Sequence, residues 1–493
     1  MRCARALAGL VFTLPLVFAA CGGGDDDGGD DEATDDTGTD GSAQDQVTWN
    51  KDIAPLVAER CGSCHREGGI GPFSVETYDA AAPFAPLMVK RVEAGEMPPW
   101  DAVSTDDCEP RFAWRDDPRL SDDEQALLGA WVDAGAPEGD PASAAPVPEP
   151  PGQDLADITH RVAPEVGYAT SGDSDEFVCF VLDPKIAVDS WITGLHMVPS
   201  LLEVAHHGVL TVVPPAGQAD ILSRVGPDGH FDCFGGVTAP GSYFAGVWVP
   251  GAQPFETPEG VGIPLVANSL LVLQMHYHPA GKEHDPDATE VQLRVTEDPP
   301  EKQLLFTAVG NIETPPILLP GPDDDGAVEF RIPASVAGHT ETMRFPIPIP
   351  GSTKRFPILS AFPHMHYVGV DLEVKILRAH PAPEEPSEEC LIKVPHWNFD
   401  WQRTYQYDAD LSELPTVGDG DEITIRCTYD NTVENPYVQR ALDEAGLELP
   451  VDISLGEETL DEMCLAAFGV VFDGPTTAPA TSSPLDVGLG LGR

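Results

Sequence analysis

Histidines that could bind a metal ion lie close together at three places in the chain. His206 and His207 are adjacent, His276 lies in a separate apolar run, and His364 and His366 flank one residue. Neutral imidazoles are common ligands of transition metals. The apolar alternation around the last pair predicts a strand, in which side chains two residues apart share a face. We therefore expect His364 and His366 to reach one metal ion from the same side.

Met463, in the motif Asp-Glu-Met-Cys, offers a second kind of ligand. A thioether together with imidazoles suits copper, which cycles between two oxidation states. Three imidazoles can form one copper site, and two imidazoles with a thioether can form another.

Cys61-Gly62-Ser63-Cys64-His65 has the Cys-x-x-Cys-His spacing that attaches c-type haem. The two cysteines would form thioethers with the porphyrin, and the imidazole of His65 would bind the iron. A redox dithiol and half of a zinc site are the alternatives. The adjacent histidine, the lack of a second cysteine pair and the export signal described below favour one covalent haem c.

A methionine later in the same segment is expected to be the other axial ligand of the haem iron. Met97 lies beside prolines, which end helices. Met88 is the alternative, but its apolar neighbours predict a core position. Ser121 and Glu124 form a capping box before an apolar helical face. The segment resembles a class I-like cytochrome c domain.

The remaining elements must position these groups. Short alternating runs are broken by many of the 50 prolines and 47 glycines, a pattern typical of antiparallel sandwiches. These runs extend over ~320 residues, which is too many for one sandwich core. The expected fold is therefore mainly β. It has two antiparallel, jelly-roll-like β-sandwich copper domains, preceded by a small α-helical cytochrome c domain, with the boundary between the sandwiches at residues 297–301.

The N-terminal residues indicate export. Arg2 and Arg5 precede an apolar stretch that is short for a membrane span, and residues 18–21 resemble a bacterial lipobox in which Cys21 would be lipidated. An ordinary secretory signal with a chance cysteine is the alternative. We expect a lipid-anchored protein of the bacterial cell envelope, on the periplasmic side or the outer surface.

Changes in composition along the sequence divide the chain into seven expected parts. These are a lipoprotein signal peptide (1–20), an acidic disordered tether (21–46), a cytochrome c-like domain (47–136), a Pro-rich linker (137–154), a first copper domain (155–298), a second copper domain (299–475) and a disordered tail (476–493). The formal net charge of −55 excludes nucleic acid as a partner, because phosphate binding needs clustered Lys and Arg.

Four histidine or methionine segments occur in the order found in one enzyme family. They are residues 204–207, 273–277, 363–366 and 461–464. Together they resemble the copper type II, ascorbate-dependent monooxygenases, the family of peptidylglycine α-hydroxylating monooxygenase and dopamine β-monooxygenase. The resemblance covers most of residues 175–471, and residues 245–251 and 258–262 also resemble a loop region of that family.

The resemblance implies two copper ions across a solvent-filled cleft, one in each β domain. The electron-transfer copper would be held by His206, His207 and His276, and the copper that binds dioxygen by His364, His366 and Met463. His278 is expected to support a ligand or to lie on the surface. The implied partners are a small-molecule substrate that is hydroxylated at a C–H bond, dioxygen, and ascorbate or another one-electron donor.

The resemblance also pairs Cys179 with Cys233, and Cys427 with Cys464. The second bridge would hold the segment that bears Met463. Six cysteines of the chain could form disulfides in an exported protein. The resemblance thus assigns four of them to two bridges.

Two features lie outside the family pattern. Peptide-amidating members have an arginine two residues before the His-x-His that binds the substrate carboxylate, but this chain has Phe362 there. Neither peptide amidation nor a catecholamine substrate is therefore supported. Cys108 and Cys390 also remain, and the sequence leaves open whether they pair.

An envelope-anchored copper monooxygenase with a fused cytochrome c is the favoured hypothesis. The haem, kept near by the linker, is expected to relay electrons to the first copper; sensing of redox state or docking of a partner is the alternative. A protein that only transfers electrons or binds copper is the second hypothesis. Zinc sites are the third, which is disfavoured because no obvious carboxylate base lies near the histidine pairs.

Overall fold

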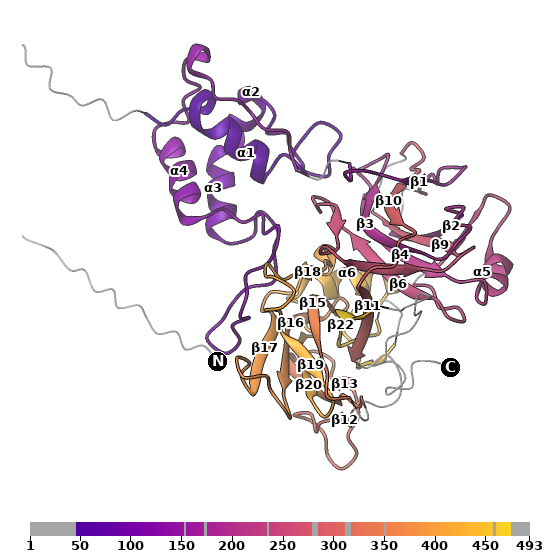
Figure 1. The fold of residues 1–493 in the computed structure, drawn as a ribbon. Helices are drawn as coiled ribbons and strands as arrows, with labels where there is room; N and C mark the ends of the chain where they lie inside the picture. The colour runs from indigo at the N-terminus through magenta and orange to yellow at the C-terminus, as the bar shows by residue number, and fades with distance from the viewer. Residues whose placement is uncertain are drawn as a thin grey trace, which may run out of the picture. The chain divides into compact units, whose positions relative to one another are not determined.

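The computed structural model describes residues 46–151, 154–171, 175–233, 236–278, 284–310, 317–349, 352–456 and 460–474. The expected signal peptide, nearly all of the acidic tether, and the C-terminal tail lie outside these residues. Residues 1–45 and 46–493 are separate units, and the following concerns the second. It is mainly β, with about 35% strand, 15% helix and several antiparallel sheets, as the sequence predicted (Figure 1). No helix in the described ranges combines the length and the apolarity needed to cross a membrane.

Four α-helices lie in the N-terminal part of the described chain, and the cysteine motif directly follows the first of them. The capping box predicted at Ser121 is present, since its side chain accepts the N–H of Glu124 and the Glu124 carboxylate accepts the N–H of Ser121. Leu128 and Trp131 follow on the buried face of that helix and share a core with Ile53. The helices are α1 (Ala54–Arg60), α2 (Tyr78–Ala81), α3 (Ala85–Glu93) and α4 (Asp122–Asp133).

Between α3 and α4 the chain leaves the helices and lies against β strands near the C-terminal end of the sequence. We call residues 100–118 the strap. Trp114 stacks on Tyr407 with ring centroids 4.7 Å apart. Cys108 forms a disulfide with Cys390, which resolves the pairing that the sequence left open. The helices are thus fastened to the β region by a covalent bond as well as by the linker.

Removing this bridge with Cys108→Ser and Cys390→Ser should lower the free energy of unfolding by roughly 2–4 kcal/mol, because the unfolded chain gains entropy. Urea unfolding of the oxidised proteins measures the change, with Thr105→Ser in the strap as the conservative control. An unchanged unfolding midpoint would show that aromatic packing of the strap, and not the disulfide, holds it.

Residues 155–298 supply a five-stranded sheet, in the order β5-β2-β9-β4-β6, and the strands β1-β10-β3-β8 of a ten-stranded sheet. Alternate residues of β2, among them Val178 and Phe180, share one core with Ile192 and Leu195 of β3. The elements are β1 (His160–Val162), β2 (Glu176–Leu182), β3 (Ser190–Val198), β4 (Ala205–Val213), α5 (Gln218–Arg224), β5 (His230–Asp232), β6 (Tyr243–Trp248), β7 (Phe255–Glu256), β8 (Val261–Leu265), β9 (Leu270–Tyr277) and β10 (Glu290–Thr296).

Residues 299–474 supply the remaining path of the ten-stranded sheet, β11-β22-β15-β18, and a second five-stranded sheet, β12-β14-β20-β16-β17. The elements are β11 (Lys302–Gly310), β12 (Ile317–Leu318), β13 (Arg331–Ile332), β14 (Ala337–Pro346), β15 (Arg355–His364), β16 (Gly369–Leu377), β17 (Glu388–Val394), β18 (Tyr405–Gln406), β19 (Thr416–Gly418), β20 (Glu422–Asp430), α6 (Pro436–Ala445), β21 (Ile453–Ser454) and β22 (Leu465–Asp473).

One sheet crosses the boundary that the sequence predicted at residues 297–301. Lys302 and Gln303 of β11 pair in parallel with Val261 and Gly262 of β8. The two halves of the β region are therefore joined through backbone hydrogen bonds as well as by the chain connection.

Both disulfides that the resemblance implied are confirmed. Cys179 is bonded to Cys233, and Cys427 of β20 is bonded to Cys464. The second bridge fixes the residue that follows Met463.

Candidate functional site

The first histidine cluster is formed by two neighbouring strands, β4 and β9. His207 lies opposite His276, and the register shifts between Ala205 and His207. Such an irregularity lets consecutive side chains depart from strict alternation. The Nδ1 atoms converge, with His206 and His276 3.0 Å apart and His276 and His207 3.3 Å apart. The structure thus brings together the three predicted ligands, which form a group of suitable geometry for a metal ion.

Burial favours the neutral form of two imidazoles of this cluster. It lowers the pKa of His206 and His207 well below the usual value, and the neighbouring His276 lowers both further. Because a metal ion binds the deprotonated ring, these two ligands need lose no proton at neutral pH.

Asp175 orients the first cluster from outside. Its Oδ2 lies 3.0 Å from Nε2 of His276, the nitrogen that faces away from the convergence point. Asp175 also contacts Nδ1 of His278 and forms an ion pair with Arg440 of α6. His278 is half exposed and lies outside the converging group, as expected for a residue that supports a ligand.

Carboxylates do lie beside both histidine sets, so the expectation that none does is wrong. Asp175 and Asp400 contact the first cluster, and Glu462 contacts the second. All three are far from their histidines in sequence, which is why spacing did not reveal them. Asp175 and Asp400 face the outer nitrogens of the rings, the position of a group that orients a ligand.

Replacing Asp175 with Asn should weaken copper binding at the first cluster roughly 10- to 100-fold, because the ring of His276 loses its charged partner. Competition with a chromophoric copper chelator measures this in a His364→Ala background, where only the first cluster is titrated. Asp183→Asn, a surface change in the same half, is the control. Equal affinities for the Asp175 and Asp183 variants would contradict an orienting role.

The second histidine pair does not lie within one strand, so that prediction is wrong. β15 ends at His364, and His366 lies in the turn before β16. The buried carboxylate of Glu462 accepts the backbone N–H groups of His366 and Val368, the latter at 3.2 Å, and so replaces the strand ladder. The turn nevertheless holds the two imidazole centroids 5.1 Å apart.

Hydrogen bonds leave one nitrogen of each ring in the second pair available. Nδ1 of His364 lies 2.7 Å from Oε1 of Gln402, and Nδ1 of His366 lies 3.0 Å from the carbonyl oxygen of Asp461. Both Nε2 atoms remain for a metal ion. Burial and the neighbouring His366 lower the pKa of His364 to about 3, so this ring is neutral too.

Glu462 also positions Met463. Its carboxylate accepts the N–H of Met463 at 2.7 Å and, through the same oxygen, the N–H of His366. The carbonyl of Met463 accepts a hydrogen bond from the hydroxyl of Tyr429 at 3.1 Å, and Cys464 is held by its disulfide. The main chain of the predicted thioether ligand is therefore fixed next to His366.

The ring of Phe399 lies near one histidine of each cluster. Its centroid is 6.5 Å from that of His276 and 6.5 Å from that of His366. The two clusters thus share an aromatic neighbour.

The predicted haem residues line a cavity of about 470 Å³. Cys61 and Cys64 are the cysteines that form no disulfide in the described part of the chain. Nδ1 of His65 lies 3.0 Å from the carbonyl of Phe73, which leaves Nε2 as the free nitrogen. Burial raises the pKa of Cys61 to about 12, so its thiol is protonated.

The two candidate methionines both line this cavity. Met88 is buried and joins the helical core, as expected, whereas Met97 is 38% exposed. Trp401 and Arg403, which follow the second half's Phe399 in the chain, complete the cavity wall. These two residues lie far from the cysteine motif in the sequence, so the motif gives no sign of them.

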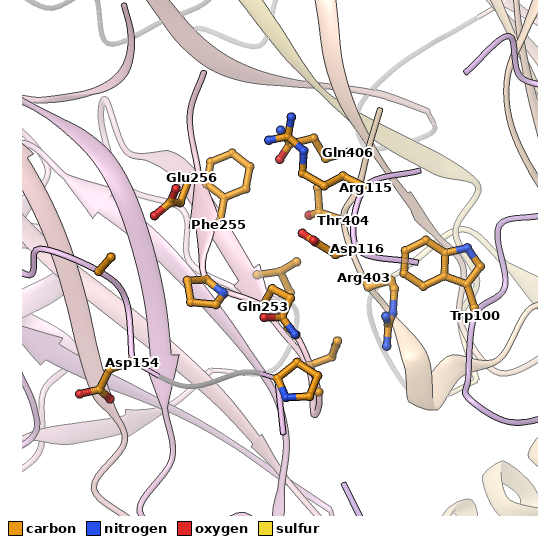
Figure 2. A pocket seen from close by; sticks show the side chains of 17 residues that line it. Trp100, Arg115, Asp116, Asp154, Gln253, Phe255, Glu256, Arg403, Thr404 and Gln406 are labelled. Carbon is orange, nitrogen blue, oxygen red and sulfur yellow. The ribbon is translucent and has the colours of Figure 1, made fainter. Parts of the chain in front are cut away.

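A second cavity, of about 530 Å³, shares Arg403 with the first. Trp100 and Arg115 of the strap line it together with Phe255 and Glu256 of β7. Figure 2 shows Phe255 and Glu256 on one side and Trp100 and Arg403 on the other. None of the predicted metal or haem ligands lines it.

No protein-family model and no curated protein matches the chain. A cryo-EM structure of Broad Bean Stain Virus overlaps 67% of this chain and 94% of that chain, with 10% identity and a TM-score of 0.20. The infectious bursal disease virus VP2 subviral particle overlaps 67% and 83%, with 8% identity and a TM-score of 0.09. At these TM-scores neither likeness bears on the fold or the function.

Proposed function

We propose that the chain is a copper-dependent monooxygenase of the bacterial cell envelope, which hydroxylates a substrate C–H bond with dioxygen and has its own haem as an electron store. One observation carries the proposal. Three imidazoles converge in one cluster, two imidazoles lie 5.1 Å apart beside the main chain of Met463 in the other, and one phenylalanine ring lies near both.

The residues of both clusters fit copper. Three converging Nδ1 atoms suit a site that only changes oxidation state, and two free Nε2 atoms with a thioether suit a site with an open position. Bound copper would supply one-electron chemistry at the first cluster and activation of dioxygen at the second. His206, His207 and His276 are the proposed ligands of one copper, and His364, His366 and Met463 of the other.

The chain's own side chains hold these ligands in place. Asp175 fixes the ring of His276, and Gln402 fixes that of His364. Glu462 holds the main chain at His366 and Met463 together. Preorganised ligands of this kind keep a metal site from relaxing when its charge changes.

The surroundings of His364 favour an uncharged, apolar substrate. The ring of Phe362 lies 6.3 Å from that of His364 and 6.2 Å from that of Phe244. Phe306 contacts Phe244 at 4.8 Å. These rings are partly exposed, and Phe362 stands where the peptide-amidating enzymes have a basic anchor.

The cavity at Cys61 and Cys64 fits a covalent haem c, with His65 as the proximal ligand and Met97 as the distal ligand. Haem would supply a one-electron store. The finer architecture that we propose is a cytochrome c-like domain followed by two copper β-sandwich domains. A lipid on Cys21 would anchor the chain, and ascorbate or another one-electron donor would reduce it.

An electron-transfer or copper-binding protein without hydroxylase activity is the alternative, which the closeness of the Phe399 ring to both clusters favours. Metal analysis of the purified full chain tests the metal assignment shared by both. We expect two copper ions and one covalent haem per chain, and zinc at both clusters in copper-replete cells would contradict the proposal. Hydroxylated product, addressed below, separates the two candidates.

A further inference from the structure

A five-residue segment, 399–403, contacts both histidine clusters and the haem cavity; we call it the junction segment. It begins with the short helix Phe399–Trp401, and the side chain of Asn398 caps this helix by accepting the N–H of Asp400. The centre of the Phe399 ring lies 6.5 Å from that of His276 and 6.5 Å from that of His366.

Two side chains of the junction segment reach ligands directly, one in each cluster. Oδ1 of Asp400 lies 3.6 Å from Nε2 of His206. Oε1 of Gln402 lies 2.7 Å from Nδ1 of His364. In both cases the contact is to the ring nitrogen that does not face the proposed metal.

The residues that alternate with these two face the haem cavity. Trp401 and Arg403 line it together with Cys64. The guanidinium of Arg403 also lies 5.1 Å from the centre of the Trp100 ring. Trp401 is bonded through peptide groups to Asp400 on one side and Gln402 on the other, so few covalent bonds separate the cavity wall from either cluster.

We propose that the junction segment carries electrons from the haem to both copper sites, with Trp401 as the entry point, Asp400 as the branch to the first cluster and Gln402 as the branch to the second. This rests on the proposed function, and it extends the relay from the first copper to both. Electron transfer weakens steeply across gaps, so the favourable route follows covalent bonds and close polar contacts, which are a hydrogen bond at His364 and an ion-pair contact at His206.

Each transfer takes one electron from the haem iron, which becomes ferric, and reduces one cupric ion to the cuprous state. Two transfers, with two protons from solvent, balance the conversion of dioxygen and a C–H bond into an alcohol and water. A one-electron donor, such as ascorbate or a small redox protein, returns the haem to the ferrous state.

A competing route leads to the first cluster alone. A Cβ placed on Gly251 would lie 3.3 Å from Sγ of Cys64, so this loop also approaches the haem cavity. Gly251 follows β6, whose Trp248 pairs with Gly208, the neighbour of His207. This route contains no contact with His364.

The test uses the full chain loaded with haem and cupric ions. Haem is reduced rapidly by light, its reoxidation is followed by absorbance, and loss of each cupric signal is followed by freeze-quench electron paramagnetic resonance. Trp401→Leu should slow the reduction of both coppers severalfold, and Trp401→Phe should restore part of the rate. Gln402→Leu should slow only the second copper, and Asp400→Asn only the first. Phe255→Leu, in the wall of the other cavity, should change neither.

Unchanged rates in Trp401→Leu would overturn the proposal. It would also be overturned if only one copper were reduced by the haem and Trp248→Leu slowed that transfer. If Trp401→Leu fails to retain haem or copper, Gln402→Leu and Asp400→Asn test the proposal instead. Each should slow the reduction of one copper only, and equal effects on both coppers would overturn the proposal. A haem that stays reduced in a chain that still hydroxylates with ascorbate would also overturn it while the proposed function stands. Absence of copper from the purified chain would instead remove the proposed function.

Discussion

The double variant Cys61→Ala and Cys64→Ala should carry no covalent haem. Both thiols line the same cavity, and within the described residues neither forms a disulfide and Nδ1, not Nε2, of the neighbouring His65 is hydrogen-bonded. Without the cysteines no thioether can form, whatever the affinity of the cavity for free haem. Acid–acetone extraction, which removes haem that is not covalently bound, should leave haem on the unmutated protein and none on the variant.

The double variant Cys108→Ser and Cys390→Ser is the matched control, since it removes two cysteines of the same chain that lie outside the cavity. It should keep its covalent haem. Haem that is extracted from the unmutated protein would contradict the assignment, and so would covalent haem on the Cys61 and Cys64 variant.

Met463→Leu should nearly abolish hydroxylation while copper at the three-histidine cluster persists. The change keeps a similar volume, and such swaps usually cost less than about 1.5 kcal/mol of stability. A loss of hydroxylation in this variant would therefore reflect the loss of the thioether from the second copper site. Product formation with ascorbate, copper content and the urea unfolding midpoint are measured on the same preparation.

Met343→Leu is the control, because Met343 is a buried methionine of β14 outside both clusters. It should remain active. If Met463→Leu keeps full activity, the thioether serves only in packing, and two imidazoles alone hold the second copper.

Local patterns in the sequence predicted much of the β structure. Short runs broken by prolines and glycines marked strands such as β2 and β4. These predictions succeeded because strand-forming residues and the turns that bound them are local properties of the chain.

The strand predicted through the His364–His366 motif failed for a reason that local patterns cannot contain. Glu462, which lies almost a hundred residues later, accepts the N–H of His366 and turns the chain there. The alternation that continues in the sequence belongs to the next strand, β16. A buried carboxylate that accepts N–H groups in place of a neighbouring strand leaves no pattern in the sequence near those N–H groups.

Long-range contacts account for what the sequence did not reveal about the candidate site. Asp175 lies outside helices and strands, Asp400 and Trp401 lie in a three-residue helix, and tertiary packing brings all three to residues far away in the chain. The sequence contained one sign that the strap is attached to the β region, namely the cysteines Cys108 and Cys390. Because the family pattern pairs neither of them, the sequence allowed this disulfide but did not establish it.

The central claim is that oxygen from dioxygen is inserted into a C–H bond at the second cluster. The most direct measurement is mass spectrometry of products formed under ¹⁸O₂ by the haem- and copper-loaded chain, with ascorbate and a panel of uncharged, apolar substrates. The account predicts one ¹⁸O atom in the product and none with the variant His366→Ala, whose first cluster is intact. A fully loaded chain that yields no labelled product, or one that yields as much with His366→Ala, would contradict it.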